Sequence, residues 1–307
     1  MNQLSISCPA NSPLDLPLVE PIFARHETFH PRFGWLKKGF DLIKEDPNIF
    51  LREDAPVSLG VGKNMVRSIR YWCEAFKVMS KNAPSEFGVQ LFADGAWDSF
   101  LEDPASLWLL HWNLLKPTCR AAAWYFTFFE FKNVDFTTEE LIKELNEWQQ
   151  TFKKQVVESS LKKDISCILR MYSSNETSTN FLEDSIDSPF QQLGLIQNLG
   201  TRGYSFKTGA KANLPASIVV VACLEYASWV NETAKTIAIS RLVYDSGSPG
   251  MAFKLSENVL CEAIEKVVRT HDNLELSDTA GLIQLSYDGD PKQLADNLLQ
   301  KYYQRRV

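Results

Sequence analysis

Two groups of residues near the start of the chain have types and spacings that could do chemistry. The first is a row of basic and hydrogen-bonding side chains that recur at helical spacing: Lys63, Asn64, Arg67, Ser68 and Tyr71. Lysine and arginine bind phosphate or guanine, and asparagine can pair with adenine, so this row could contact DNA. The second is the string His26-Glu27-Thr28-Phe29-His30, which matches the zinc-binding pattern H-E-x-x-H.

The basic row belongs to the second of two predicted short helices. Asp54 and Pro56 favour the start of the first helix, and Gly60 and Gly62 favour a tight turn after it. The second helix starts near Lys63, and its opposite side is apolar, with Val66, Ile69, Trp72, Cys73, Phe76 and Met79. Two helices joined in this way form a helix-turn-helix, whose second helix enters the major groove of DNA. The alternative is an ordinary pair of packed helices with a solvated basic face.

A further helix is predicted before this pair. It runs from Pro31 to about Glu45 and would be the first helix of a three-helix unit. Lys37 and Lys38 lie outside its apolar face. Together with Arg70, we expect these two lysines to lie near DNA phosphates.

A β-hairpin is predicted after the second helix, between Ala83 and Trp97. Apolar residues alternate at Phe87, Val89 and Leu91, and the Asp94-Gly95 pair is a strong turn signal. A hairpin in this position would be the wing of a winged helix-turn-helix domain. The alternative for the same run is the end of a helix followed by a loop.

The histidine motif has an unfavourable context for zinc. In a metalloprotease, H-E-x-x-H lies in the middle of a helix, where both histidines bind zinc and the glutamate acts as the base. Here Pro31 follows the second histidine directly and disfavours helical geometry for it. His26, Glu27 and His30 are therefore weak metal candidates, and we expect a polar cluster of neighbouring charged side chains instead.

A second set of acidic residues is spaced closely enough to suggest a nuclease metal site: Asp94, Asp98, Glu102 and Asp103. Acidic residues also favour turns and helix starts, and Asp103-Pro104 precedes a predicted helix, so we interpret the set as caps. The sequence has no glycine-rich phosphate loop, Ser-His-Asp arrangement or dinucleotide fingerprint. It therefore predicts neither an enzymatic activity nor a cofactor.

The chain is acidic overall but basic in the helix-turn-helix region. Its 307 residues carry a net charge of −6, whereas the stretch from Arg25 to Lys81 holds eleven Lys and Arg against seven Asp and Glu. A basic patch on an acidic body favours contact with particular DNA sites over bulk coating of nucleic acid. The six scattered cysteines indicate free thiols in a reducing cytoplasm, and we expect no membrane span, because no apolar run approaches about 18 residues.

These patterns predict a mainly α fold with small β-hairpins. Thr137 to Glu140 form a capping box that opens a helix to about Val157. The expected order of regions is an N-terminal arm (1–20), a winged helix-turn-helix domain (21–116), a helical middle region (117–175) and a C-terminal α+β domain (176–307).

The C-terminal region resembles a second winged-helix module. From Leu214 to Tyr287, the predicted order is helix, short element, helix and hairpin. Its expected recognition helix, after Ser256, carries Glu257, Glu262 and Glu265 against Lys266 and Arg269, so it is poorly suited to phosphates. This module therefore suits a protein partner or a second copy of the chain better than DNA.

Several stretches together resemble one bacterial family, DUF4007, whose members have no firmly assigned activity. They are FARHETFHPRFGWLKKGFD (residues 23–41), LGVGKNMVRSIRYW (59–72), LEDPASLWLLHW (101–112) and SPGMAFKLSE (248–257). The resemblance implies a genomic setting, because such genes often lie beside genes for sulfur-handling DNA modification. It implies a role in DNA phosphorothioation or an allied anti-phage defence system, and it transfers no catalytic residue.

The leading hypothesis is an accessory or regulatory protein that binds double-stranded DNA in the cytoplasm, together with sulfur-modification or defence-system proteins. A non-DNA-binding interaction subunit of such a complex is the first alternative, and a homodimer is compatible with either. A metal-dependent hydrolase or nuclease is the weaker alternative, and it would need the histidine motif or the acidic set as ligands.

Overall fold

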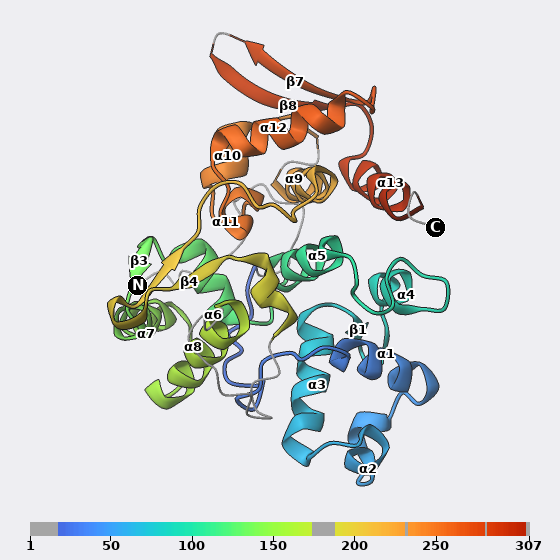
Figure 1. Ribbon diagram of the computed structural model, residues 1–307, viewed down its shortest axis with the longest axis vertical. Coiled ribbons are helices and arrows are strands. Elements are labelled where there is room, and N and C mark those ends of the chain that lie inside the picture. The colour runs from blue at the N-terminus through green and yellow to red at the C-terminus, as the bar shows by residue number, and fades with distance from the viewer. Residues whose placement is uncertain (1–17, 174–187, 231–232, 280, 305–307) are drawn as a thin grey trace.

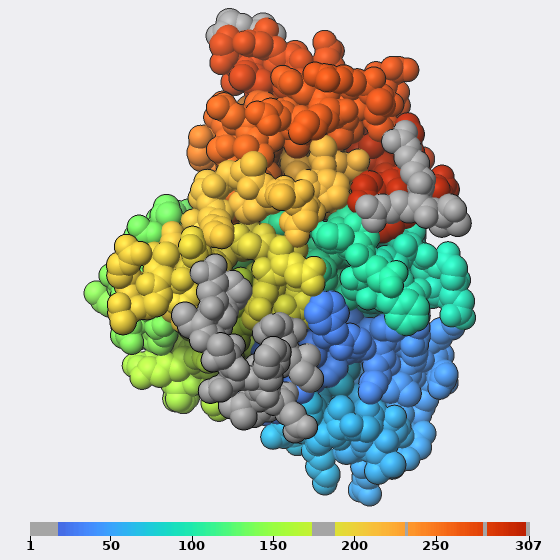
Figure 2. Space-filling model, in the orientation of Figure 1, coloured from blue at the N-terminus to red at the C-terminus, as the bar shows by residue number. Residues whose placement is uncertain are grey.

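Helices dominate the fold, and the β-structure is confined to small antiparallel sheets. The computed structural model describes residues 18–173, 188–230, 233–279 and 281–304. With 55% helix and 11% strand, it confirms the mainly α class predicted from the sequence. None of its helices is both long and apolar enough to cross a membrane in the residues described. Figures 1 and 2 show the N-terminal helices at one end of the long axis and the C-terminal hairpin at the other.

Three helices form the N-terminal unit, as the sequence predicts. They are α1 (Trp35–Glu45), α2 (Ala55–Leu59) and α3 (Lys63–Ala75), with the 3-10 turn η1 (Ile49–Leu51) between the first two. α1 begins later than predicted, because Gly34 takes a left-handed conformation (φ 77°) directly before it. Gly60 (φ 65°) ends α2 in a left-handed conformation too, and the turn into α3 follows.

α1 packs closely against the buried side of α3 at Gly39. A Cβ atom built at Gly39 would collide with Cys73 Sγ and would lie 3.1 Å from Ile69 Cγ2. The missing side chain therefore sets the distance between the two helices.

The predicted wing between Ala83 and Trp97 is wrong. The run from Phe87 to Leu91 lies in helix α4 (Glu86–Phe92), which Ser85 caps by accepting a hydrogen bond from the Gly88 N–H at 2.9 Å. In a run this short, the two-residue repeat of a strand cannot be distinguished from the repeat of a helix. The Ser85 cap favours the helix. A smaller hairpin precedes α4, formed by β1 (Met79–Ser80) and β2 (Ala83–Pro84).

The middle of the chain is helical, and its first two helices are deeply buried. Its elements are α5 (Pro104–Leu115), α6 (Ala122–Tyr125), the π-helical turn η2 (Phe126–Glu130), α7 (Thr138–Trp148), the 3-10 turn η3 (Gln149–Thr151) and α8 (Glu158–Tyr172). α5 is buried from Ala105 to Leu115, as its nearly continuous apolar run requires. Thr137 and Glu140 form the predicted capping box, although α7 ends at Trp148 and not near Val157.

A three-stranded antiparallel sheet joins segments that are distant in sequence. Its strands are β3 (Asp135–Phe136), β4 (Ile196–Asn198) and β5 (Tyr204–Phe206), in the order β3-β5-β4. The 3-10 turns η5 (Pro189–Leu193) and η6 (Gly200–Arg202) flank β4 in sequence. The sheet thus pairs the predicted middle region with the start of the predicted C-terminal domain, and the domain divisions themselves stay a prediction.

The C-terminal region contains the predicted helix, short element, helix and hairpin in that order, but two further short helices come between the short strand and the second predicted helix. It contains α9 (Ala216–Val230), β6 (Thr236–Ala238), α10 (Ile239–Tyr244), α11 (Pro249–Phe253), α12 (Glu257–Val268), β7 (Leu274–Thr279), β8 (Leu282–Tyr287) and α13 (Pro291–Gln304). The strands pair antiparallel in the order β6-β8-β7. α12 and α13 pack on α9, whose residues are almost all apolar.

Replacing Gly39 by Ala should lower the free energy of unfolding by about 1–3 kcal/mol, the usual cost of overpacking a core. Urea unfolding followed by tryptophan fluorescence measures the loss. The control is the double variant G39A/C73A, in which removal of the colliding sulfur should return part of the lost stability. If the two substitutions instead destabilise additively, the close approach of α1 to Cys73 is not as described.

Candidate nucleic-acid interface

The exposed face of α3 is narrow and lies at the N-terminal end of the helix. Lys63, Asn64 and Arg67 are exposed there, whereas Val66 and Ile69 on the other side are buried. The first turn of α3 contains no acidic residue, so the positive end of the helix dipole adds to the charge of Lys63. Three of the predicted DNA-binding residues therefore lie next to one another on the solvent-exposed surface.

The Arg67 side chain is 67% exposed and loosely held. Its Nη1 atom lies 3.5 Å from Asn64 Oδ1 and 3.7 Å from Glu27 Oε1. Exposed ion pairs of this kind contribute about 0–1 kcal/mol, so a phosphate group can replace the carboxylate at little cost. Arg67 and Asn64 thus form an adjacent pair of hydrogen-bonding groups at the surface.

Arg70, one turn further along α3, is bound within the protein. Its Nε atom lies 3.3 Å from Glu74 Oε1, and its Nη2 atom donates to Asn82 Oδ1 at 3.0 Å. Glu74 also accepts a hydrogen bond from Arg120 Nη1 at 2.8 Å, so this half of the helix carries balanced charges. We therefore expect Arg70 to contribute less to DNA binding than Lys63 and Arg67.

Ser68 and Tyr71 do not face solvent, and the expectation that they contact DNA is wrong. Ser68 is fully buried with its Oγ atom 3.5 Å from the Phe29 carbonyl oxygen, and the Tyr71 hydroxyl donates to the Arg120 carbonyl at 3.3 Å. Burial raises the pKa of Tyr71 well above its ordinary value. Both residues lie at the edge of the polar side of α3, and other parts of the chain pack on that edge.

Lys37 and Lys38 lie on α1, which packs on the buried side of α3. Lys37 Nζ lies 2.6 Å from both carboxylate oxygens of Asp41, and Lys38 Nζ donates to the Leu59 carbonyl at 3.1 Å. Both lysines line a cleft on the outer side of α1. They do not extend the exposed row on α3, so their expected contact with phosphates beside it lacks structural support.

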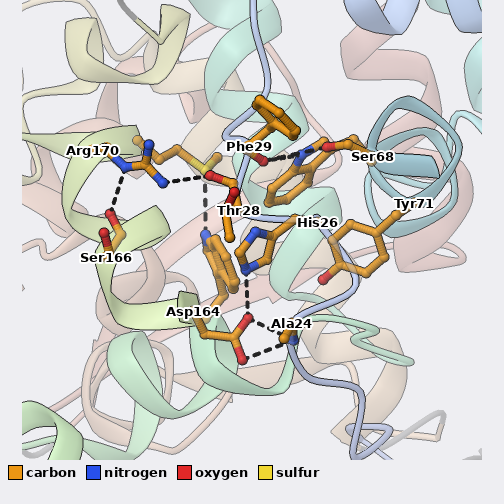
Figure 3. Close-up of polar contacts among 12 residues, drawn as sticks. Ala24, His26, Thr28, Phe29, Ser68, Tyr71, Asp164, Ser166 and Arg170 are labelled. Atoms are coloured by element: carbon orange, nitrogen blue, oxygen red, sulfur yellow. Dashed lines mark hydrogen bonds and ion pairs between the residues drawn. The ribbon is translucent and has the colours of Figure 1, made fainter. Parts of the chain in front are cut away.

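A buried histidine–aspartate pair anchors the chain segment beside α3 (Figure 3). His26 Nε2 lies 2.8 Å from Asp164 Oδ1, and the same carboxylate accepts a hydrogen bond from the Ala24 N–H at 2.9 Å. The His26 ring also stacks on Trp72, with centroids 6.1 Å apart. Burial raises the pKa of Asp164, and the hydrogen bond from His26 opposes that rise. The pair therefore ties α8 to the segment that packs on α3.

The backbone of this segment contradicts a metalloprotease site at His26, Glu27 and His30. Residues 24–28 form turns and not a helix, and three of them have positive φ angles between 50° and 69°. The two histidines and the glutamate therefore do not project from one helical face as zinc binding requires. More generally, the described part of the chain holds no group of three or more His, Cys, Asp or Glu side chains placed to bind a metal ion.

Two members of the acidic set before α5, Asp98 and Asp103, form caps, as predicted. Asp98 accepts hydrogen bonds from the N–H groups of Glu102 and Asp103, each at 2.9 Å. Asp103 in turn caps α5 through the Ala105 N–H at 2.9 Å. These carboxylates are already engaged in holding the loop.

Sequence reasoning missed Asp164 and Arg170, which hold the segment beside α3 from α8. Arg170 Nη2 donates to the Thr28 carbonyl, and Trp72 Nε1 donates to the Phe29 carbonyl at 3.0 Å. No local pattern links His26 with Asp164, because they are 138 positions apart. The signal in the sequence was Asp164 itself, a carboxylate at a position of the amphipathic helix where the spacing predicts a buried apolar side chain.

The comparison with protein families identifies the class of this protein. The chain belongs to the DUF4007 family, described as a protein of unknown function, whose model matches residues 23–303. This confirms the resemblance seen in the sequence.

Two solved structures are similar to the chain as a whole. One is a crystal structure of SspB, with 36% sequence identity, a TM-score of 0.89, and coverage of 94% of this chain and 89% of that chain. The other is a magnesium-ion-bound crystal structure of SspB, with 35% identity, a TM-score of 0.87 and the same coverage. A comparison with curated proteins found no match.

Replacing Asp164 by Ala should lower the free energy of unfolding by about 3–5 kcal/mol, because it leaves the buried His26 ring and the Ala24 N–H without their acceptor. Lys163→Ala is the matched control on the same helix; its exposed side chain predicts a change within about 0.5 kcal/mol. Urea unfolding of both variants gives the comparison. Equal stability of the two variants would mean that the pair does not hold the segment in place.

Proposed function

We propose that this protein binds double-stranded DNA through the N-terminal half of α3, as an accessory or regulatory component of a phosphorothioation-type DNA modification system or an allied anti-phage defence system. The observation that carries the proposal is the row of Lys63, Asn64 and Arg67, which is exposed on a helix whose other sides are buried. The family assignment and the similarity to SspB support the sulfur-modification setting.

The arrangement of α2 and α3 supports this role. The two helices are joined by a turn at Gly60 and Gly62, and the start of α3 lies beside α2 at the end of the molecule away from the C-terminal hairpin (Figure 1). In a helix-turn-helix, the N-terminal residues of the second helix contact base edges. Asn64 has the amide that pairs with adenine, and Lys63 and Arg67 have the charges that bind phosphate or guanine.

The number of free cations sets the expected salt dependence. Lys63 and Arg67 are exposed, whereas Arg70 is bound to Glu74 and Asn82. Two or three phosphate contacts predict that the logarithm of the affinity falls with the logarithm of salt at a slope of roughly −2 to −3. Such a shallow salt dependence suits a protein that contacts particular DNA sites and does not coat nucleic acid in bulk.

Arg67→Ala should weaken binding to a short duplex by about tenfold at low salt and should make the salt slope shallower by about one. Lys292→Ala is the matched control, because Lys292 is an exposed lysine on α13. Fluorescence anisotropy across a salt series measures both quantities. The proposal fails if the wild-type protein has no duplex affinity at low salt, or if the two variants bind alike.

A preference for modified DNA is tested with matched duplexes that differ by one phosphorothioate. If the protein acts on modification sites, the affinities for the two duplexes should differ by at least severalfold over the whole salt series. Identical affinities would leave duplex binding intact and would remove the link to sulfur modification.

The second candidate function is a protein-interaction subunit, and α12 is the observation that favours it. α12 lies beside an antiparallel sheet in an arrangement that resembles a winged helix, and its exposed side carries Glu262 and Glu265 with Lys266. Acidic side chains in the recognition position repel DNA and suit a basic protein surface. In that case the protein would assemble with its partners while Arg67→Ala leaves function intact.

A further inference from the structure

A cleft of about 490 Å³ lies on the outer side of α1, apart from the exposed row on α3. Its walls come from the start of α1, the end of α2 and the loop between α4 and α5. In Figure 1, α1 lies between α2 and α4. The volume is within the range of small-molecule and cofactor sites, roughly 300–1,000 Å³.

Two exposed phenylalanines line this cleft. Phe33 is 47% exposed and Phe100 is 75% exposed. Among the phenylalanines that the structure describes, these two alone are exposed, and both belong to the same cleft. Exposed aromatic rings beside an opening provide flat surfaces on which a planar group can stack.

The loop that carries Phe100 is held firmly in its conformation. The Asp98 carboxylate accepts the N–H groups of Glu102 and Asp103, and it also accepts the Ser106 hydroxyl at 2.6 Å. Leu101, next to Phe100, has a positive φ of 56°, a conformation that costs a non-glycine residue free energy. Phe100 is therefore exposed on a rigid loop. Because the loop is already ordered, a ligand that binds there loses less entropy in ordering it.

The positive charge of the cleft is centred on Lys38. Lys37 is neutralised by Asp41, whose carboxylate also lines the cleft, so an anion would avoid that side. Lys38 donates to the Leu59 carbonyl, and an ammonium group has three donors, so two of its N–H groups can bind an anion. The start of α1 also lines the cleft and has no acidic residue in its first turn, which adds positive potential.

We propose that this cleft binds a nucleotide, with the base stacked on Phe100 or Phe33 and the phosphate at Lys38. A cation beside stacking rings in an open groove is the arrangement that proteins use for single strands. The same chemistry would bind either a nucleotide of single-stranded DNA or a free mononucleotide. Experiment separates these two sources of the ligand. The proposal does not rest on the duplex site, because none of its residues lies on α3.

The experiment measures fluorescence anisotropy of a labelled oligothymidine single strand with the full-length protein. Phe100→Ala and Lys38→Ala should each weaken binding by about tenfold, and Phe100→Trp should retain it, because the larger ring still stacks. Val57→Ala is the matched control, since Val57 is an 83% exposed apolar side chain that does not line the cleft. Circular dichroism confirms that each variant is folded.

A competition with thymidine monophosphate separates the two sources. Displacement of the strand by the mononucleotide assigns the cleft to free nucleotides, and binding of the strand alone assigns it to single-stranded DNA. Arg67→Ala should weaken duplex binding without changing either result, so the two proposals fail separately. The nucleotide proposal is overturned if the wild-type protein binds neither probe, or if Phe100→Ala and Lys38→Ala bind as the wild type does; the cleft would then suit a protein segment.

Discussion

The burial of Trp72 is the interaction on which the rest of the N-terminal structure depends. Its side chain is fully buried, its Nε1 donates to the Phe29 carbonyl at 3.0 Å, and its ring contacts His26 and Trp124. Because Trp72 projects from α3, these contacts fix the rotation of that helix about its axis. With Gly39 of α1 packed on another side, only one face remains for solvent, and it carries Lys63 and Arg67. The buried contacts of α3 therefore determine that the basic row faces solvent.

The two ends of the molecule expose helices of different charge. At one end, α3 exposes cations and an amide; at the other, α12 exposes Glu262 and Glu265 with one lysine, Lys266, beside a β-hairpin. Helix surfaces with such charges select different partners, because a like charge at an interface costs free energy. A protein that contacts DNA at one end and a protein at the other would connect the two, which suits an accessory role.

Local sequence signals predicted the helices well and their surroundings poorly. The capping box at Thr137 and the proline after Asp103 each fixed a helix start, because a cap acts within one turn. The run from Phe87 to Leu91 does not form the predicted wing, because its alternation also fits a helix when Ser85 caps it. Tyr71 is buried, and not exposed as predicted, because a segment distant in sequence packs on it. No pattern along α3 indicates that contact.

Hydrogen exchange of the full-length protein, with and without a short duplex at low salt, tests most directly whether α3 binds DNA. If α3 binds DNA, the duplex should slow exchange in the peptides that span residues 59–70 and leave it unchanged in those that span 257–268. Protection of the second segment, or of neither, would contradict the claim that α3 is the surface that meets DNA.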